Sequence, residues 1–490
     1  MTTAQDQNDK TTLKHLALTL GALVREAKEL DLPTVVIIEG LDGSGKGLLL
    51  NKIILEIDAR SYDISSTHAG DKQARKYPLL WRIAQNTPQK GRLQFYDRSA
   101  YYLTLDAWAD DRIHKNELPY YWEDIQKFER QLTDDGVHLI KIFLTVSQKE
   151  QAKRFTDLEK NPSTAWRVRK KDWKRNKQYD AQQIQIARLI DHTHKSDTPW
   201  FIINTDEIKK ATFAVYEVLI QSYEQAIQKQ KLHLNERPQP RDWIHYTGPD
   251  YIAQIDLAKS LDRALYKRRL KARQSEMYDL VHEIHDLNIP VVMVYCGADA
   301  AGKGGCIKRL LQGIDPRSFT VIPVGAPTKE EIDHHYLWRF WKKLPPRGKI
   351  SIFDRSWYGR VLVERVEQLC TNEEWQRAYH EINEFESHLT SFGTVVIKFW
   401  LHIDSDTQLE RFKARQNNPH KQWKITDDDW RNREKAHLYR EATNEMIDKT
   451  NTRQAPWHII PSTSKHHARI ETLDLTIAHL KSAIKKARQK

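Results

Sequence analysis

The sequence repeats itself at a fixed spacing. Lys46 in GLDGSGKG and Lys303 in GADAAGKG lie 303 − 46 = 257 positions apart. Asp97-Arg98-Ser99 and Asp354-Arg355-Ser356 are separated by the same interval, 354 − 97 = 257. The same offset relates further pairs, among them Trp81 with Trp338, Trp166 with Trp423, and Pro199 with Pro456. A constant offset of this length indicates that a whole domain has been duplicated without net insertion, and it excludes a solenoid of short repeats.

The duplication predicts two tandem domains, residues 1–230 and 251–490, joined by a linker at 231–250. The polar, proline-bearing stretch KLHLNERPQPRDW opens this linker. The total of 490 residues gives each domain enough chain to bury its own core. Hydrophobic residues form 39% of the sequence and charged residues 29%, a composition that excludes a disordered chain.

The sequence carries no signal for a membrane or for secretion. No apolar run approaches the roughly 20 residues that a membrane helix needs. The first residues, MTTAQDQNDK, are polar and lead into no apolar core. The three cysteines have no paired spacing, which argues against a disulfide framework and against a cysteine-based zinc site. We therefore expect a cytoplasmic protein without a membrane partner.

Each copy alternates short apolar runs with helical segments. Residues 34–38 and 291–295 are rich in β-branched side chains and stand between a proline and a glycine, which favours strands buried on both faces. Later apolar runs follow at 93–96 and 139–144 in the first copy and at 350–353 and 394–401 in the second. This alternation predicts an α/β fold with a mainly parallel sheet covered by helices in each domain.

A glycine-rich loop follows the first predicted strand of each copy. In the order strand, G-x-x-x-x-G-K, helix, the glycines let backbone N–H groups turn toward phosphate oxygens, and the lysine reaches the outer phosphates. Two such matches at equivalent places predict a phosphate-binding loop, or P-loop, in preference to two surface turns. In the second copy the predicted phosphate-binding residues are Gly297, Ala300, Ala301, Gly302, Lys303, Gly304 and Gly305.

The residue after the P-loop lysine departs from the usual pattern. Gly47 and Gly304 stand where a Ser or Thr hydroxyl normally holds Mg²⁺. Each copy instead offers one aspartate inside the loop and one at the end of the second apolar run: Asp42 and Asp97, then Asp299 and Asp354. Because two carboxylates would repel a phosphate chain unless they carried a cation, we expect Mg²⁺ at Asp299 and Asp354.

An alternative for Asp354 is a helix N-cap, since the sequence DRS stands where a helix could start. The adjacent Arg355, matched by Arg98 in the first copy, weakens that interpretation. A fixed guanidinium is what a transferring phosphoryl group needs.

Basic residues exceed acidic ones and give a formal net charge of +12. Such a charge attracts anionic ligands, although it also serves solubility alone. Arg411 and Arg415, spaced i and i+4, share one face of a predicted helix, and Lys424 follows them. This segment is either a lid that excludes water from the phosphates or a solvated basic face, and the sequence leaves both interpretations open.

More specific motifs are present in the second copy. They are GADAAGKGG, VGAPTKEE, HHYLWRFWKKLPPRGKISIFDRSWYGRVLVERVE, NNPHKQWKITDDDW and APWHII. In this order they resemble the second family of polyphosphate kinases, and the fused pair of domains is similar to its two-domain, AMP-phosphorylating members. The resemblance implies a thymidylate-kinase-like fold, Mg²⁺ dependence, and transfer of the terminal phosphoryl group of inorganic polyphosphate to AMP, which yields ADP.

The resemblance also implies roles for individual residues. Lys303 and the loop backbone would contact phosphates, and Asp299 would orient the acceptor phosphate or hold metal. Asp354 would bind Mg²⁺, while Arg355, Arg411 and Arg415 would neutralise the transferring group. Further candidates for the acceptor site or the lid are Thr328, Glu331, Arg360, Glu364, Arg365 and Lys424.

The first copy retains the loop residues Asp42, Lys46, Asp97 and Arg98 but departs from the second copy elsewhere. Residues 68–71 stand where the second copy has GAPT at 325–328. Five charged positions are also lost, because Arg360, Glu364, Arg365, Arg415 and Arg433 correspond to Leu103, Ala107, Trp108, Leu158 and Asn176. We therefore hypothesise that the second copy is catalytic and that the first is a degenerate scaffold able at most to bind phosphate.

Two other functions share some of these features. An ATP-dependent nucleoside monophosphate kinase would also have a P-loop and a lid. A basic nucleic-acid-binding protein could use a retired P-loop fold, although no motif of the familiar nucleic-acid modules is present. The expected partners are inorganic polyphosphate and AMP or ADP rather than nucleic acid, and assembly into a homo-oligomer stays open.

Overall fold

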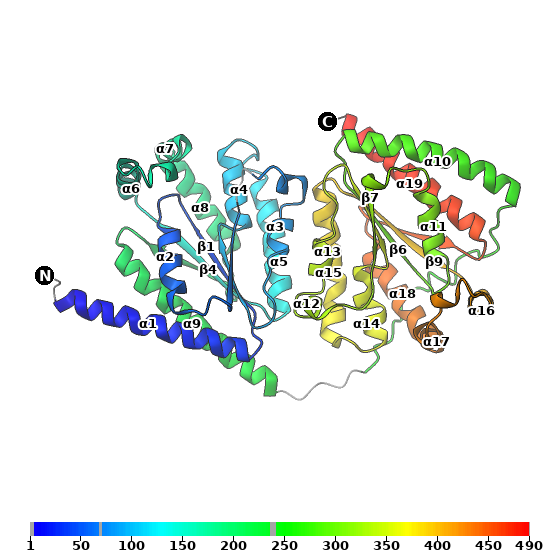
Figure 1. Ribbon diagram of the computed structural model, residues 1–490, viewed down its shortest axis with the longest axis horizontal. Coiled ribbons are helices and arrows are strands. Elements are labelled where there is room, and N and C mark those ends of the chain that lie inside the picture. The colour runs from blue at the N-terminus through cyan, green and yellow to red at the C-terminus, as the bar shows by residue number, and fades with distance from the viewer. Residues whose placement is uncertain (1–3, 68–70, 236–241, 490) are drawn as a thin grey trace. The chain divides into compact units, whose positions relative to one another are not determined.

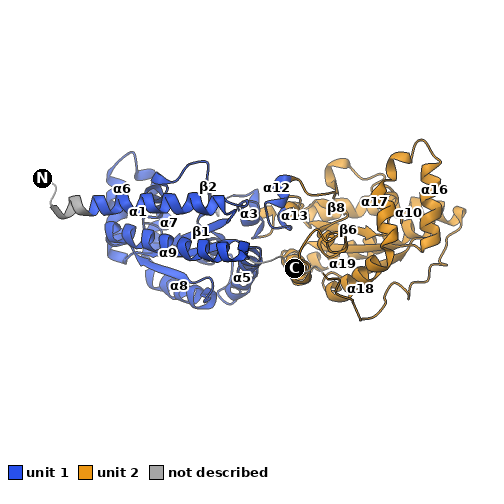
Figure 2. Ribbon diagram, turned by 90° about the horizontal axis from the view of Figure 1, so that it is seen from below, with its two compact units in different colours: residues 1–74, 79–238, 329–338 blue, residues 75–78, 239–328, 339–490 orange. Residues whose placement is uncertain are grey.

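The computed structural model describes residues 4–67, 71–235 and 242–489. It forms two compact units (Figure 2). Unit 1 comprises residues 1–74, 79–238 and 329–338, and unit 2 comprises residues 75–78, 239–328 and 339–490. The division after residue 238 falls within the predicted linker, of which residues 236–241 lie outside the described residues. Residues 68–70, most of the expected counterpart of GAPT, also lie outside them.

Unit 1 is built on a parallel sheet of five strands (Figure 1). The strand order is β2-β3-β1-β4-β5, so the P-loop strand β1 lies in the middle. Every pairing in this sheet is parallel. The strands are β1 (Thr34–Gly40), β2 (Tyr62–Ser66), β3 (Leu93–Asp97), β4 (His138–Thr145) and β5 (Trp200–Asn204).

Helices cover the sheet of unit 1. The long helices α1 and α9 pack together with the P-loop helix α2, and their buried side chains, such as Leu20, Leu49 and Leu219, meet Val36 and Ile142 of the central strands. Helices α4, α5 and α8 form a second group. The helices are α1 (Ala4–Glu29), α2 (Lys46–Ile53), α3 (Trp81–Ala84), α4 (Ala100–Ala109), α5 (Leu118–Asp134), α6 (Gln148–Lys160), α7 (Lys170–Lys177), α8 (Tyr179–Thr193) and α9 (Ile208–Asn235).

Unit 2 has the same topology. Its strand order, β10-β9-β6-β8-β7, read in reverse matches that of unit 1 strand for strand, and all of its pairings are parallel. The strands are β6 (Val291–Gly297), β7 (Phe319–Pro323), β8 (Ile350–Asp354), β9 (Val395–His402) and β10 (Trp457–Pro461). The prediction of two parallel sheets flanked by helices is confirmed.

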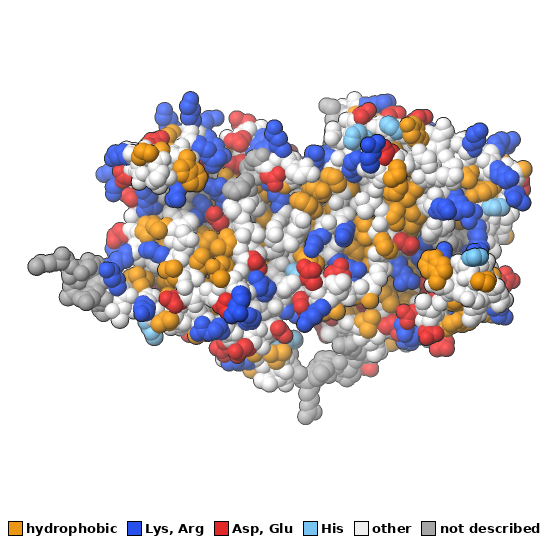
Figure 3. Space-filling view, in the orientation of Figure 1, with side chains coloured by type: hydrophobic (Ala, Val, Ile, Leu, Met, Phe, Trp, Pro, Cys, Tyr) orange, Lys and Arg blue, Asp and Glu red, His pale blue; other side chains and the backbone are white. Residues whose placement is uncertain are grey.

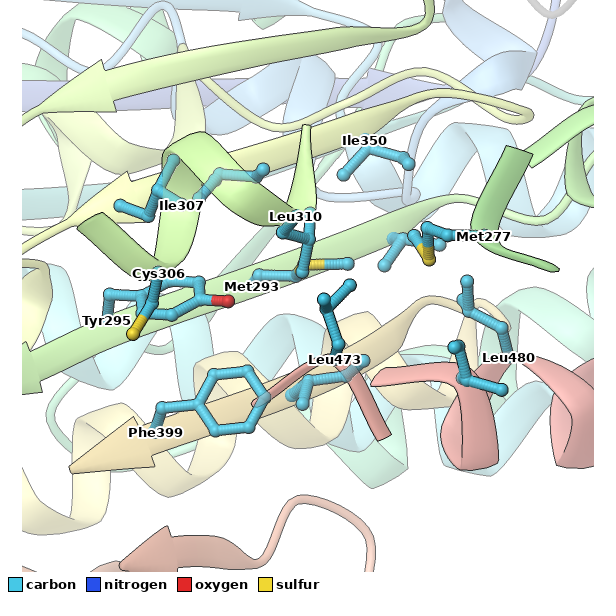
Figure 4. Packing of buried hydrophobic residues seen from close by; sticks show 14 of the residues in the cluster. Met277, Met293, Tyr295, Cys306, Ile307, Leu310, Ile350, Phe399, Leu473 and Leu480 are labelled. Atoms are coloured by element: carbon cyan, nitrogen blue, oxygen red, sulfur yellow. The ribbon is translucent and has the colours of Figure 1, made fainter. Parts of the chain in front are cut away.

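The core of unit 2 fills the space between its sheet and three helices. Figure 4 shows Met293 and Tyr295 of β6 and Phe399 of β9 facing Leu310, Leu473 and Leu480 from the helices. The helices of the second copy are α10 (Arg263–Asp286), α11 (Lys303–Leu310), α12 (Lys329–Ile332), α13 (Trp338–Trp341), α14 (Val363–Val366), α15 (Asn372–Ser391), α16 (Ser405–Gln416), α17 (Asp427–Glu434), α18 (Ala436–Thr450) and α19 (Lys465–Arg488).

Among the described residues, none of the helices combines the length and the hydrophobicity that crossing a bilayer requires.

Candidate active site

The glycine-rich loop of unit 2 connects the end of β6 to the start of α11. Gly297 has φ of 140°, and a Cβ atom at this position would lie 2.2 Å from the carbonyl oxygen of Leu401, so no side chain fits there. Gly302, with φ of 108°, directly precedes the first residue of α11. The loop residues 299–306 line a cavity of about 810 Å³. The N-terminus of α11 therefore borders a space large enough for phosphate groups.

Two cations hold the backbone of this loop. Lys303 Nζ donates to the carbonyl oxygens of Gly297 and Ala298, at 2.8 and 3.2 Å. The guanidinium of Arg411 donates to four carbonyl oxygens, those of Ala300, Ala301, Ser462 and Thr463. Arg411 lines the cavity while its donors contact the backbone, and its expected role toward the transferring group stays a prediction. Arg411 thus supports the P-loop and ties it to the segment after β10.

The two predicted metal-binding carboxylates, Asp299 and Asp354, line the same cavity. Asp299 lies in the loop, and its two oxygens accept from Arg355 Nη2 at 3.3 Å and from Asn432 Nδ2 at 2.9 Å. Asp354 ends β8, which pairs with β6 in a register that sets Asp354 beside Tyr295. The sheet therefore brings together carboxylates that are far apart in the sequence.

The N-cap interpretation of Asp354 is wrong. The cap of the helical turn 357–361 is Ser356, whose hydroxyl accepts from the backbone N–H of Tyr358. Asp354 is therefore left for another role. Within the described residues no three metal-ligating side chains cluster, so the protein offers carboxylates that phosphate oxygens and water would have to complete. That donor set suits Mg²⁺, which usually keeps several waters and binds through one or two carboxylates and substrate phosphates.

Basic side chains surround the cavity, and Figure 3 shows Lys and Arg gathered beside α11 and α16. Nine of them line it, against four aspartates. The basic residues are Lys303, Arg355, Arg411, Arg415, Lys421, Lys424, Arg431, Lys465 and Arg469, and the aspartates are Asp299, Asp354, Asp428 and Asp429. Burial lowers the pKa of Lys465, and the nearby Arg411 and Arg469 act in the same direction. An anionic ligand would relieve this concentration of positive charge.

The basic segment after α16 contributes to the cavity. Arg415 donates to the carbonyl oxygen of Lys424 at 3.1 Å, and Lys424 lies 4.9 Å from the ring of Trp423. All three residues line the cavity. We call residues 415–434 the lid segment. Its position favours the lid interpretation over a merely solvated face.

Several predicted acceptor or lid residues do not line the cavity. The side chain of Arg365 is 1% exposed, pairs with Glu445 at 2.6 Å and lies over the rings of Trp243 and Trp375. Arg365 also donates to the carbonyl oxygen of Ile244. The expectation that Arg365 serves the acceptor site or the lid is therefore wrong, because its charge is used to anchor the segment before α10.

The remaining candidates are spread over three places. Arg360 pairs with Glu364 at 3.1 Å, and burial raises the pKa of that carboxyl. Thr328 is exposed and immediately precedes α12. Glu331 lies in α12, which belongs to unit 1. None of these four side chains lines the cavity, and their roles stay predictions.

Sequence reasoning missed four residues that line the cavity: Arg431, Asn432, Lys465 and Arg469. Lys465 and Arg469 lie in the first turns of α19. A position-by-position comparison of the two copies would have found them, since at the offset of 257 Ile208 and Thr212 replace Lys465 and Arg469.

The equivalent place in unit 1 has different side-chain pairs. Arg175, at the position of Asn432, pairs with Asp42 at 3.3 Å and with Asp106 at 2.5 Å. Arg98 also pairs with Asp42, at 3.0 Å. Although burial acts to raise the pKa of Asp42, Lys46, Arg98 and Arg175 hold it below its usual value. A small pocket of about 50 Å³ lies beside Asp42, Asp106 and Arg175, but residues 43–49 of the P-loop and its helix do not line it.

The P-loop of unit 1 nevertheless has the same internal bonds. Lys46 Nζ donates to the carbonyl oxygens of Gly40 and Leu41, as Lys303 does in unit 2. Arg154 donates to the carbonyl oxygens of Gly43 and Thr205. Asp97 ends β3 and Arg98 follows it with φ of 70°. The loop architecture is thus retained in both units.

A P-loop at the end of a central parallel strand, one carboxylate in that loop, a second at the end of the neighbouring strand, and a ring of cations together define a phosphotransferase of the P-loop kinase class. The profile of the family described as Polyphosphate kinase 2 (PPK2) matches residues 3–231 and 260–489. The chain therefore belongs to the polyphosphate kinase 2 family, and each half is one family domain.

Relatives of full length support this assignment. A polyphosphate:AMP phosphotransferase from Pseudomonas aeruginosa is 34% identical over 484 residues, which cover 98% of this chain and 97% of that protein. A protein of the same name from Pseudomonas syringae pv. tomato is 35% identical over 456 residues, covering 93% of this chain and 92% of that protein. The crystal structure of a polyphosphate kinase 2 from Pseudomonas aeruginosa matches with a TM-score of 0.85 and 33% identity, covering 98% of this chain and 97% of that one.

Proposed function

We propose that this chain is a Mg²⁺-dependent polyphosphate:AMP phosphotransferase. It moves the terminal phosphoryl group of inorganic polyphosphate to the phosphate of AMP, with ADP and a shortened polyphosphate as products. The observation that carries this proposal is the cavity of unit 2, where a P-loop, two carboxylates and nine basic side chains meet. The names of the full-length relatives specify polyphosphate and AMP.

The cavity suits two anionic substrates. Polyphosphate carries about one negative charge per internal unit, so a ring of cations attracts it, and the attraction weakens as salt rises. Lys421, Lys424, Lys465 and Arg469 are placed to bind the chain, while the P-loop binds the phosphates nearest the reaction. Mg²⁺ at Asp299 and Asp354 would neutralise part of the charge on donor and acceptor as they approach each other.

The transfer needs alignment and charge stabilisation rather than a covalent enzyme intermediate. An oxygen of the AMP phosphate forms a bond to the terminal phosphorus, and the bond from that phosphorus to the bridging oxygen of polyphosphate breaks. Negative charge passes to the shortened chain, where Arg355 and Lys303 are placed to stabilise it. The lid segment, by covering the phosphates, would keep water from competing as acceptor.

Catalysis belongs to unit 2 in this proposal. The loop aspartate of unit 1 is already paired with Arg98 and Arg175. Four further cations of unit 2, Arg415, Lys421, Lys465 and Arg469, correspond to Leu158, Thr164, Ile208 and Thr212 in unit 1. Unit 1 therefore lacks four of the cations that would bind polyphosphate in unit 2.

The deciding experiment incubates the purified chain with AMP, inorganic polyphosphate and Mg²⁺ in the absence of ATP. We expect ADP to accumulate, and excess chelator to stop its formation. ADP formation only after ATP is added would replace the proposal with a nucleoside monophosphate kinase. Tight binding of nucleic acid without any phosphoryl transfer would instead favour the nucleic-acid-binding alternative.

The cytoplasm is the location that we propose. All three cysteines, Cys296, Cys306 and Cys370, are free and buried. Unpaired thiols suit a reducing compartment, and AMP is found there.

A further inference from the structure

The P-loop aspartate of each unit is faced by the same position of one short helix. In unit 2 this position is Asn432 of α17, whose Nδ2 donates to Asp299 Oδ2 at 2.9 Å. In unit 1 it is Arg175 of α7, whose Nη1 lies 3.3 Å from Asp42 Oδ2. The two residues are 432 − 175 = 257 positions apart. The two units therefore differ at the contact that decides the charge around this carboxylate.

The other contact of the aspartate is common to both units. Arg355 lies 3.3 Å from Asp299, and Arg98 lies 3.0 Å from Asp42. The side chain of Arg355 is 58% exposed, however, whereas that of Arg98 is 18% exposed. An ion pair with an exposed arginine is screened by water and contributes little. Asp299 thus keeps most of its negative charge, while Asp42 has two well-buried guanidinium partners.

A third residue fixes the orientation of the amide in unit 2. Tyr439 Oη donates to Asn432 Oδ1 at 3.0 Å. Because the amide oxygen accepts from this hydroxyl, the amide nitrogen is the atom that faces Asp299. An amide donor orients a carboxylate without neutralising it, whereas a guanidinium both orients and neutralises it.

We propose that Asn432, held by Tyr439, is a positioning residue for Asp299, and that the residue at this place of the helix decides whether a P-loop carboxylate can take a divalent cation. In unit 1 the guanidinium of Arg175 acts as a built-in cation between Asp42 and Asp106. In unit 2 the neutral amide leaves Asp299 charged and pointed into the open cavity. This inference deepens the proposed function, on which its rate measurements rest.

The first test transfers the unit 1 residue to unit 2. Asn432→Arg is compared with the wild-type chain and with Gln376→Arg, which adds the same charge at an exposed site of α15 outside the cavity lining. Binding of Mn²⁺ to the full chain is followed by the paramagnetic resonance signal of the free ion, with and without inorganic tripolyphosphate. We expect Asn432→Arg to weaken Mn²⁺ binding by at least about tenfold. Gln376→Arg should bind Mn²⁺ as the wild type does.

The melting temperature separates this effect from misfolding. Since Asn432→Arg would create an ion pair with Asp299 rather than leave a buried charge alone, its melting temperature in the absence of metal should not fall. Wild-type Mn²⁺ affinity in a folded Asn432→Arg variant would overturn the proposal. So would an equal loss of affinity in Gln376→Arg, because the effect would then be one of overall charge.

The second test uses the rate of ADP formation to examine how Asn432 and Tyr439 position Asp299. Asn432→Ala and Tyr439→Phe both loosen the orientation of Asp299, so we expect the Mg²⁺ concentration for half-maximal rate to rise by about three- to tenfold. The KM for polyphosphate should change by less than about twofold, because neither change removes a cation. Equal changes in both constants would contradict a specific role toward the cation site.

The two proposals fail in different ways. If the wild-type chain makes no ADP from AMP and polyphosphate, the proposed function fails, while the Mn²⁺ measurements still test the inference. If the wild type makes ADP but Asn432→Arg is fully active with normal Mg²⁺ dependence, the inference alone fails.

Discussion

Buried charged groups that recur in both copies reveal which residues serve the fold rather than the reaction. Lys398 in β9 has no exposed side-chain surface, and its Nζ donates to Glu386, to Tyr358 Oη and to the carbonyl oxygen of Thr450, each at 2.8 Å. Lys141 in β4 of unit 1 pairs in the same way with Glu129 at 3.1 Å. Because unit 1 retains this network although it lacks several of the cations that line the cavity of unit 2, the role of the network is structural. The P-loop lysines, also retained in both units, need a functional test.

Replacing each P-loop lysine separately tests which unit catalyses the formation of ADP. Lys303→Ala should lower kcat by at least about a hundredfold, since a cation that stabilises the transferring phosphates is removed. Lys46→Ala should leave most of the activity, since four of the cations that line the cavity of unit 2 are replaced by uncharged residues in unit 1. Initial rates of ADP formation give both values. An equally large loss in Lys46→Ala would show that unit 1 takes part in catalysis.

A pair of histidines predicts how the stability of unit 2 depends on pH. His458 Nε2 and His479 Nε2 lie 2.8 Å apart. Burial, together with His479, lowers the pKa of His458 to about 4, and burial also lowers that of His479. The unfolded chain therefore binds these protons more readily than the folded chain, and the free energy of unfolding should fall as pH decreases from about 6.5 toward 4.

The first copy supplies the control for this prediction, because Phe201 stands at the position of His458. In His458→Phe, the unfolding transition of unit 2 should depend less on pH between 7 and 5 than in the wild type. Urea unfolding at several pH values measures this difference. An unchanged pH dependence would mean that other groups dominate the acid response.

At the scale of elements, the sequence predicted the central strands and missed the outer ones. β1, β4, β6 and β9 are buried through most of their length, so their apolar runs are unmistakable. The outer strands β2 and β7 are half-buried at two positions and exposed at three. Since an edge strand packs on fewer neighbours, its pattern resembles that of a loop.

The candidate site was predicted to a similar degree. The P-loop and its two aspartates are local motifs beside strands, and sequence alone identified them. Asn432 contacts Asp299, which lies 133 residues away in the sequence. A single asparagine belongs to no motif that would have indicated this contact. Arg365 was misassigned for the converse reason: a charged residue in a specific motif is buried against Trp243 and Trp375. Only the three-dimensional packing separates these cases.

The lid segment supports a prediction about polyphosphate affinity. Arg415→Leu combined with Lys421→Thr introduces the residues found in the first copy and removes two charges from the cavity. We expect the KM for polyphosphate to rise about tenfold and its dependence on salt to become shallower, because fewer ions are released on binding. The KM for AMP should change little.

The reciprocal change is the control for the lid. Leu158→Arg adds a charge to unit 1 and should leave the KM for polyphosphate unchanged. Steady-state kinetics at several salt concentrations distinguish the two variants. If the double variant kept the wild-type KM, the lid segment would be only a solvated basic face.

At the scale of the whole molecule, one fold appears twice with different side chains around its P-loop. The topology is the same, but the loop aspartate faces an amide in unit 2 and a guanidinium in unit 1. In unit 1 the side chain of Asp106 has no exposed surface and pairs with Arg112 and Arg175. In unit 2 the uncharged Val363 takes the place of Asp106. We therefore expect Arg175 to serve the stability of unit 1 and not the reaction that we propose for unit 2.

Arg175→Asn should separate these two properties. Removing one partner from a buried ion pair costs about 3–5 kcal/mol, so the unfolding transition of unit 1 should move to lower temperature. The transition of unit 2 and the kcat for AMP should stay as in the wild type. Differential scanning calorimetry and ADP assays at a temperature below both transitions measure this. A shift of the unit 2 transition alone would contradict the assignment.

Arg175, the internal counter-ion of Asp42 in unit 1, also affects how the chain responds when magnesium and phosphate are scarce. A pocket whose acidic groups are neutralised by its own arginine needs neither magnesium nor phosphate to keep its shape. The open cavity of unit 2 holds mutually repelling cations, and a bound anionic ligand would neutralise part of their charge and stabilise the unit. When a cell has spent its phosphate reserve, we expect the second half of this chain to loosen while the first half stays as it was.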